Sequence, residues 1–111
     1  DQVPDNSPVM NEEPFGPVVP ITTFKNFKDV IERANSLEYG LTSYIFTSSQ
    51  KLAHLTADSI EAGMVAVNTF ALASAETPYG GIKQSGFGRE GGSQGIHDYL
   101  NIKYINMVMK D

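Results

Sequence analysis

Cysteine is absent from this chain of 111 residues. Disulfides and thiolate metal sites are therefore excluded within it, and so is a secreted scaffold held together by disulfides. A reducing, cytoplasmic setting is compatible with that lack. Basic residues are also scarce, since 8 Lys and Arg stand against 13 Asp and Glu, which gives a formal net charge of −5. Neither nucleic acid nor an anionic membrane is favoured as a partner by this balance.

Long apolar runs are missing as well. No segment approaches the roughly 20 apolar residues that a membrane-spanning helix requires. No signal peptide is visible, and the chain opens on Asp1 rather than Met, as expected for a piece of a longer protein. Hydrophobic residues make up 41% of the chain, which is enough for one small domain with a modest core.

Strand and helix patterns alternate in the first two thirds of the chain. Runs of β-branched or apolar residues predict strands over 18–24, 42–47 and 64–68. Apolar residues at helical spacing predict helices between them, over 27–37 and 50–62. This order predicts an α/β fold built on a βαβαβ unit, in which three parallel strands carry helices packed on the sheet.

Polar residues and glycines suggest where the two helices begin and end. Asn26 is the predicted N-cap of the first helix, and Ser48 or Ser49 is the predicted N-cap of the second. Gly40 and Gly63 follow the two helical patterns and are the predicted C-terminal stops.

The last third of the chain has a different character. Residues 69–93 form a long glycine-rich segment without periodicity, and a loop of this length is usually functional or rests on something else. Residues 94–100 are compatible with a short helix. Residues 102–109 are rich in β-forming residues and predict a strand, whose unpaired edge would need a partner.

Two apparent signals for a binding site do not withstand inspection. Residues 86–91 match G-x-G-x-x-G, but a dinucleotide fingerprint follows a strand, opens a helix and precedes an acidic residue about 20 positions on. This run lies within a loop close to the end of the chain. His54 and His97 are isolated from each other and lack a second ligand at helical spacing, so no metal site is predicted.

The segment Glu12–Val18 is the most distinctive stretch. Two prolines on either side of a glycine make it stiff and bent. It holds a carboxylate and an aromatic ring two residues apart, Glu13 and Phe15. Such a pair could accept hydrogen bonds from two neighbouring ribose hydroxyls and offer a flat face to a heteroaromatic ring. From spacing alone, a solvated acidic turn leading into a strand is the alternative.

Three segments together resemble the NAD(P)-dependent aldehyde dehydrogenase superfamily. Residues 12–18 read E-E-P-F-G-P-V, similar to the family's E-x-F-G-P segment. Residues 63–68 read G-M-V-A-V-N, similar to its G-x-V-x-V-N strand, and residues 78–91 resemble its P-F-G-G-x-K-x-S-G-x-G-R-E loop. They occur in the family's order and at its spacing, and the resemblance covers nearly all of the chain from Met10 onward.

The resemblance implies roles for particular residues. Glu13 would hold the hydroxyls of the nicotinamide ribose of NAD or NADP, and Phe15 would pack near the nicotinamide. Phe70, Ala73 and Ser74 follow the third strand in the region that lines the family's aldehyde-binding tunnel, so they are candidate substrate contacts. Members acting on succinate semialdehyde often carry a serine here, which would fall at Ala73 rather than Ser74. The identity of the aldehyde therefore stays open.

The resemblance also implies a division of the chain and a limit to its chemistry. Residues 1–93 would be the C-terminal part of the catalytic domain, and residues 94–111 a short helix and a strand that pairs between subunits of a homo-oligomer. The family oxidises a small-molecule aldehyde to a carboxylate through a thioester on a cysteine. That nucleophile and the family's base glutamate are not in this chain, so we predict no catalytic residue here and no activity of the chain alone.

An interpretation of another class remains. A small α/β interaction module without catalysis would bind a partner through the glycine-rich loop and the β-rich tail. The length of the natural gene distinguishes this module from a segment of an enzyme.

Overall fold

The computed structural model of the chain describes residues 3–110. Its elements follow in the order α1 (Pro8–Asn11), α2 (Phe27–Asn35), β1 (Tyr39–Gly40), β2 (Thr42–Ile45), α3 (Gln50–Ser59), β3 (Met64–Val67), β4 (Ile82–Lys83) and the 3-10 helix η1 (Gly95–Tyr99).

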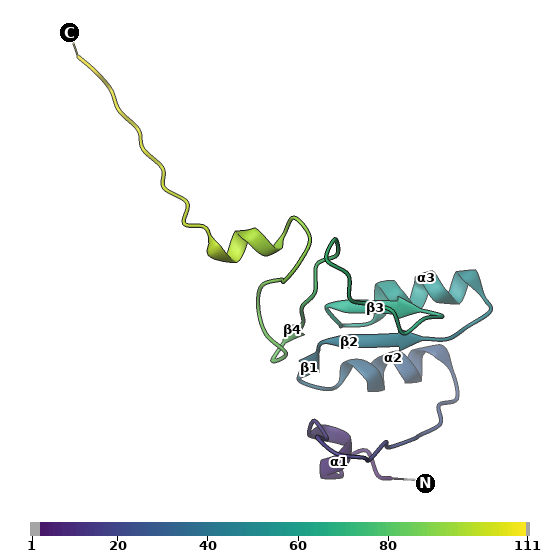
Figure 1. The fold of residues 1–111 in the computed structure, drawn as a ribbon. Coiled ribbons are helices and arrows are strands. Elements are labelled where there is room, and N and C mark those ends of the chain that lie inside the picture. The colour runs from purple at the N-terminus through teal and green to yellow at the C-terminus, as the bar shows by residue number, and fades with distance from the viewer. Residues whose placement is uncertain (1–2, 111) are drawn as a thin grey trace.

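The unit β2–α3–β3 forms the centre of the structure. The two strands are parallel, in register from Thr42 opposite Met64 to Ile45 opposite Val67. Helix α3 packs against both strands, and α2 lies along the other side of the pair in Figure 1. Met64 and Ala66 on β3 supply the buried apolar side chains of the described residues. The predicted strand–helix–strand order is confirmed for this part of the chain.

Both helices begin where the sequence predicts. The side chain of Asn26 accepts a hydrogen bond from the backbone N–H of Asp29, at 3.0 Å. The side chain of Ser49 accepts a hydrogen bond from the backbone N–H of Leu52, at 3.3 Å. Each cap satisfies one of the N–H groups that a first helical turn leaves without a partner.

The helices end earlier than predicted. Helix α3 ends at Ser59. At this end the side chain of Asn35 binds two backbone groups that a longer helix would use itself. The Asn35 amide donates to the Ser59 carbonyl at 2.8 Å, and its oxygen accepts from the Glu61 N–H at 2.9 Å. The stop predicted at Gly63 is therefore wrong, and so is the stop at Gly40, which lies in β1 while α2 ends at Asn35.

The two glycines serve close backbone approach instead. A Cβ atom on Gly63 would collide with the carbonyl oxygen of Gly80. A Cβ atom on Gly40 would lie 2.6 Å from the carbonyl oxygen of Glu61. The start of β3 and the glycine-rich segment can lie together only because these side chains are absent.

A single lysine joins the ends of both helices to β4. The Lys83 ammonium donates to the carbonyls of Asn35 and Leu37, at 2.9 and 3.0 Å, and pairs with Glu61 at 2.5 Å. A cation at the C-terminus of a helix meets unpaired carbonyls and the negative end of the helix dipole. We call Asn35, Glu61 and Lys83 the helix-end clamp.

The strand predicted over residues 18–24 does not form, which corrects the three-stranded unit to a parallel pair. Within residues 3–110 this segment pairs with no strand. Pro20 has no N–H to give to a ladder, and Arg33 on α2 binds the Thr23 carbonyl at 2.8 Å. A second, antiparallel pair joins β1 to β4.

The C-terminal region follows the prediction only in part. Helix η1 confirms a short helix within residues 94–100, although it is a 3-10 helix. Residues 101–110 are exposed and form no ladder within the described part of the chain, so the predicted strand over 102–109 is not confirmed. Figure 1 shows this segment leading away from the body, which makes the structure 78 Å long. No helix among residues 3–110 is long and apolar enough to cross a membrane.

Limited digestion with trypsin should cut after Lys103 well before it cuts after Lys83. Lys103 lies in the exposed C-terminal segment, whereas the Lys83 ammonium is bound by the helix-end clamp and its side chain is only 25% exposed. Mass spectrometry of the early fragments tests this order. First cleavage after Lys83 would contradict the clamp.

Substitution Asn35→Ala should release the end of α3. It removes both hydrogen bonds, which together are worth about 1–3 kcal/mol. Hydrogen exchange of peptides spanning residues 57–63 should therefore become about tenfold faster or more. Asn101→Ala is the matched control, because Asn101 is an exposed asparagine in the C-terminal segment. Equal exchange in the two variants would show that Asn35 does not end the helix.

Candidate functional site

The segment Glu12–Val18 begins on a groove of about 390 Å³, which its first two residues line. Glu12 and Glu13 line it together with residues from the ends of α2 and α3, among them Asn35 and Ile60. Glu13 is exposed and takes part in none of the ion pairs found among residues 3–110. Its carboxylate is therefore available to a ligand.

Phe15 stands outside this groove. The Val18 N–H donates to the Gly16 carbonyl at 2.8 Å, which closes the predicted bend directly after the phenylalanine. The Phe15 side chain is 93% exposed. The bend thus presents a carboxylate and a free aromatic face within three residues.

Asn68 determines where the chain leaves the sheet, and sequence reasoning used it only as part of a motif. Its side chain extends the parallel ladder by one residue. It accepts from the Thr47 N–H and donates to the Thr47 carbonyl, both at 2.9 Å. Its own backbone adopts φ +56°, a left-handed conformation that asparagine tolerates. The loop after Asn68 therefore starts in a fixed direction.

Phe70 joins an aromatic cluster that was not predicted. Its ring centroid lies 5.5 Å from that of Tyr44 and 5.1 Å from that of Phe46, with tilted planes. Both partners come from β2 or directly follow it. Tilted rings at this separation attract each other, so Phe70 is held against the sheet although its side chain stays 75% exposed.

Ala73 and Ser74 line a separate hollow of about 590 Å³, together with Tyr79, Glu90 and Gly91. The Ser74 hydroxyl lies 3.2 Å from that of Thr77. A hydrogen bond from Ser74, aided by a backbone N–H, lowers the pKa of the exposed Glu76 carboxyl. The Ser74 hydroxyl, a candidate substrate contact, thus already takes part in hydrogen bonds within its own loop.

The glycine-rich loop lines a hollow of about 730 Å³. Arg89 shapes it by donating from Nη1 to the carbonyls of Gly81 and Gly88, at 2.8 and 2.6 Å. Asp98 accepts from the Arg89 N–H at 3.0 Å. Gly88 has φ +76°, and a side chain there would collide with Asp98. The G-x-G-x-x-G run serves tight turns, and it opens no helix of the dinucleotide-binding type.

The hollows form a row. The Glu13 groove shares Leu41 and Ser85 with the glycine-rich hollow. That hollow shares Tyr79, Glu90 and Gly91 with the Ser74 hollow. The structure therefore brings Glu13, Ala73 and Ser74 to one continuous surface, whereas Phe15 and Phe70 line none of these three hollows. Within residues 3–110, no group of three or more His, Cys, Asp or Glu residues could hold a metal ion.

The chain is similar in sequence to a known protein family and to individual proteins of named activity. The profile of the aldehyde dehydrogenase family matches residues 1–105. Succinate-semialdehyde dehydrogenase of Paenarthrobacter nicotinovorans is 45% identical over 106 residues, which are 96% of this chain and 24% of that protein. 3-Sulfolactaldehyde dehydrogenase of Pseudomonas putida is 46% identical over 97 residues, 87% of this chain and 20% of that protein.

The fold of the chain is also similar to that of a solved structure. The NAD⁺ complex of aldehyde dehydrogenase from Bacillus cereus superimposes with a TM-score of 0.88 at 42% identity, covering 92% of this chain and 21% of that one. The chain thus spans about a quarter or less of the length of the relatives it matches. Its sequence and fold agree with theirs over almost all of its own length, and the chain belongs to the aldehyde dehydrogenase family.

Proposed function

We propose that the natural polypeptide containing these residues, here called the parent polypeptide, is an NAD(P)-dependent aldehyde dehydrogenase. The reaction converts an aldehyde, NAD(P)⁺ and water into a carboxylate, NAD(P)H and two protons. The observation that carries the proposal is the family match over residues 1–105, which includes all three motifs.

Glu13 and Phe15 are the proposed contacts to the cofactor. An exposed carboxylate without an ion-pair partner can accept hydrogen bonds from two vicinal ribose hydroxyls. A free aromatic face two residues away can pack against the nicotinamide. The Glu13 carboxylate and the Phe15 ring therefore suit the ribose hydroxyls and the nicotinamide ring of the cofactor. When bound, the cofactor supplies the hydride acceptor, and the role of this chain is to hold and orient it.

The proposed substrate is a small aldehyde with an anionic group at its far end. The two relatives named above act on aldehydes that bear a carboxylate or a sulfonate, according to their names. Ala73 and Ser74 would face this substrate from the loop, and Phe70 would form an aromatic wall beside it. Because Ser74 is partly engaged with Thr77, this loop alone does not account for recognition of an anion.

The remaining parts of the proposal concern organisation. Residues 1–93 would belong to the catalytic domain, and residues 94–111 would join subunits of a homo-oligomer through the exposed segment 102–109. A cytoplasmic location is part of the same proposal. With no cysteine in the chain, these 111 residues alone would not form the covalent intermediate.

The purified parent polypeptide should reduce NAD⁺ or NADP⁺ in the presence of succinate semialdehyde, followed by absorbance at 340 nm. Butanal is the matched uncharged substrate of similar length. We expect a kcat/KM at least about tenfold higher for the semialdehyde, which corresponds to one ionic hydrogen bond. The isolated 111-residue chain should show no turnover.

Each alternative result has a distinct meaning. Equal kcat/KM for the two aldehydes would remove the anionic group from the proposal but leave the enzyme class. Absence of activity with every aldehyde, together with a natural gene no longer than this chain, would favour the interaction module. Turnover by the isolated chain would contradict the requirement for a cysteine elsewhere.

Substitution Glu13→Gln in the parent polypeptide should raise the KM for the nicotinamide cofactor and slow hydride transfer by about tenfold or more, because it replaces charge-assisted hydrogen bonds with neutral ones. Single-turnover formation of NAD(P)H measures that rate. Glu12→Gln is the matched control from the adjacent position and should leave both values near those of the unmodified protein. The reverse pattern would transfer the role to Glu12.

A further inference from the structure

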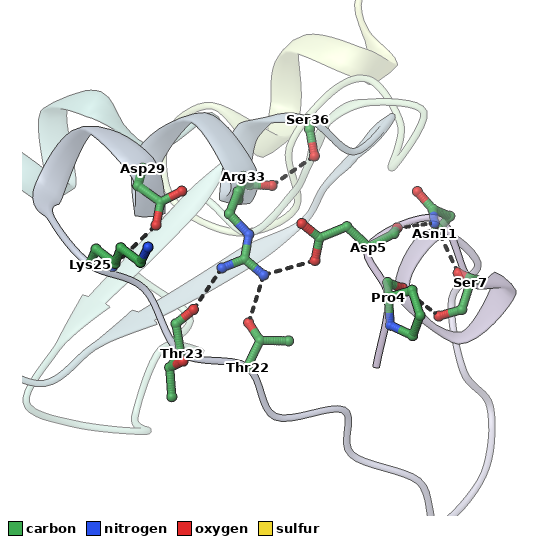
Figure 2. A network of polar contacts seen from close by, with 10 residues as sticks. All are labelled: Pro4, Asp5, Ser7, Asn11, Thr22, Thr23, Lys25, Asp29, Arg33 and Ser36. Atoms are coloured by element: carbon green, nitrogen blue, oxygen red, sulfur yellow. Dashed lines mark hydrogen bonds and ion pairs between the residues drawn. The ribbon is translucent and has the colours of Figure 1, made fainter. Parts of the chain in front are cut away.

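Arg33 on α2 binds two stretches of chain that lie on opposite sides of Glu13 in the sequence. Its Nη2 atom donates to the Asp5 carboxylate at 2.8 Å and to the Thr22 hydroxyl at 3.0 Å. Its Nη1 atom donates to the Thr23 carbonyl at 2.8 Å. Figure 2 shows the guanidinium group between the three acceptors. We call these four residues the Arg33 clasp.

The upstream flank is itself held by hydrogen bonds, so the contact with Asp5 acts on a whole segment. Upstream, the Asn11 side chain donates to the carbonyls of Asp5 and Ser7, at 2.7 and 2.9 Å, and Ser7 donates to the Pro4 carbonyl at 2.8 Å. Residues 4–11 therefore form one hydrogen-bonded unit (Figure 2). A guanidinium fork offers five donors in fixed geometry, which suits it to join several acceptors at once.

Apolar packing contributes to the position of the upstream unit through Val9 and Met10, which are half-buried. A hollow of about 490 Å³ lies between it and α2, lined by Asp5, Met10, Ile21, Phe24 and Arg33 among others. Residues 11–19 are all exposed. Within residues 3–110, the contacts of Arg33 are the side-chain hydrogen bonds that join both ends of the Glu13 segment to α2.

The electrostatics of the clasp favour a persistent contact. The hydrogen bond that Arg33 donates to Asp5 raises the pKa of Arg33 above its ordinary value, with help from the charges of Asp5 and Asp29. An arginine guanidinium is charged at any physiological pH, so the pair with Asp5 is an ionic one. The Arg33 side chain is 31% exposed and that of Asp5 63% exposed, so salt will weaken the pair in part.

We propose that Arg33 is a positioning residue for the cofactor site: by joining Asp5 to Thr22 and Thr23, it fixes the bend that presents Glu13. The inference rests on the proposed function of Glu13. Holding a binding group in place before the ligand arrives lowers the entropic cost of binding. Loss of the clasp should therefore weaken cofactor binding without removing any group that touches the cofactor.

The test uses the parent polypeptide and the variants Arg33→Leu and Asp5→Asn. Each should raise the KM for the nicotinamide cofactor by about three- to tenfold, in the range of one lost hydrogen bond, with a smaller effect on the aldehyde KM. Hydrogen exchange of peptides covering residues 12–19 should accelerate in both variants. Arg33→Lys, which keeps the charge but not the fork, should restore part of the affinity.

Lys28→Met is the matched control. Lys28 lies on the same helix and forms an exposed ion pair with Glu32 at 3.5 Å, so its loss should leave the cofactor KM and the exchange of residues 12–19 unchanged. If Arg33→Leu does not fold, Asp5→Asn still removes the negative charge of one acceptor, and Thr22→Val removes another acceptor.

A double variant distinguishes positioning from general stabilisation. In the Glu13→Gln background, Arg33→Leu should raise the cofactor KM no further, because the group it positions has already lost its charge. Additive effects would overturn the proposal. So would an unchanged cofactor KM in Arg33→Leu and Asp5→Asn when Glu13→Gln alone raises it. An unchanged KM in Glu13→Gln would instead refute the proposed role of Glu13.

Discussion

The hydrogen bonds of the Asn35 side chain are the contacts on which the rest of the structure depends. This amide completes the end of α3, while the backbone carbonyl of the same residue accepts from Lys83 on β4. Three segments that are distant in sequence therefore meet at one residue. Few apolar side chains are buried within residues 3–110, so directional polar contacts determine how α2, α3 and β4 are placed. The groove beside Glu13 exists because those ends are held together.

Polar side chains also hold chain segments in place at both ends of the candidate site. Arg33 joins the flanks of the Glu13 segment, and Asn68 fixes the start of the loop that carries Phe70, Ala73 and Ser74. Arg89 and Asp98 shape the glycine-rich loop between them. Each of these residues binds other parts of the chain, and in each set at least one contact is to a backbone group. The groups proposed to touch the cofactor and substrate are exposed and free of structural contacts, with the partial exceptions of Ser74 and Phe70.

The features that could be predicted from the sequence are local ones. Asn26 and Ser49 cap helices through contacts three residues away, and the apolar runs of β2 and β3 indicate their own pairing. The helix ends could not be predicted, because Asn35 contacts Ser59 across 24 positions. The segment 18–24 has the composition of a strand, but a strand needs a neighbour, and composition does not reveal whether one is present. Glu13 and Phe15 were found by motif, whereas the Arg33 clasp depends on a long-range contact that carries no motif.

The geometry of Asn68 separates the sheet from the loop that follows it. Its side chain makes the two hydrogen bonds to Thr47 that a further strand residue would make with its backbone. The ladder is therefore complete before the backbone turns away. Changes in the sequence or length of residues 71–78, beyond the Phe70 ring that packs on Tyr44 and Phe46, therefore need not disturb β2 and β3. A protein engineer could treat this loop as an exchangeable cassette, grafted from relatives with different aldehydes onto an unaltered scaffold. If this loop contacts the substrate as proposed, the same separation lets its sequence vary without a cost in folding.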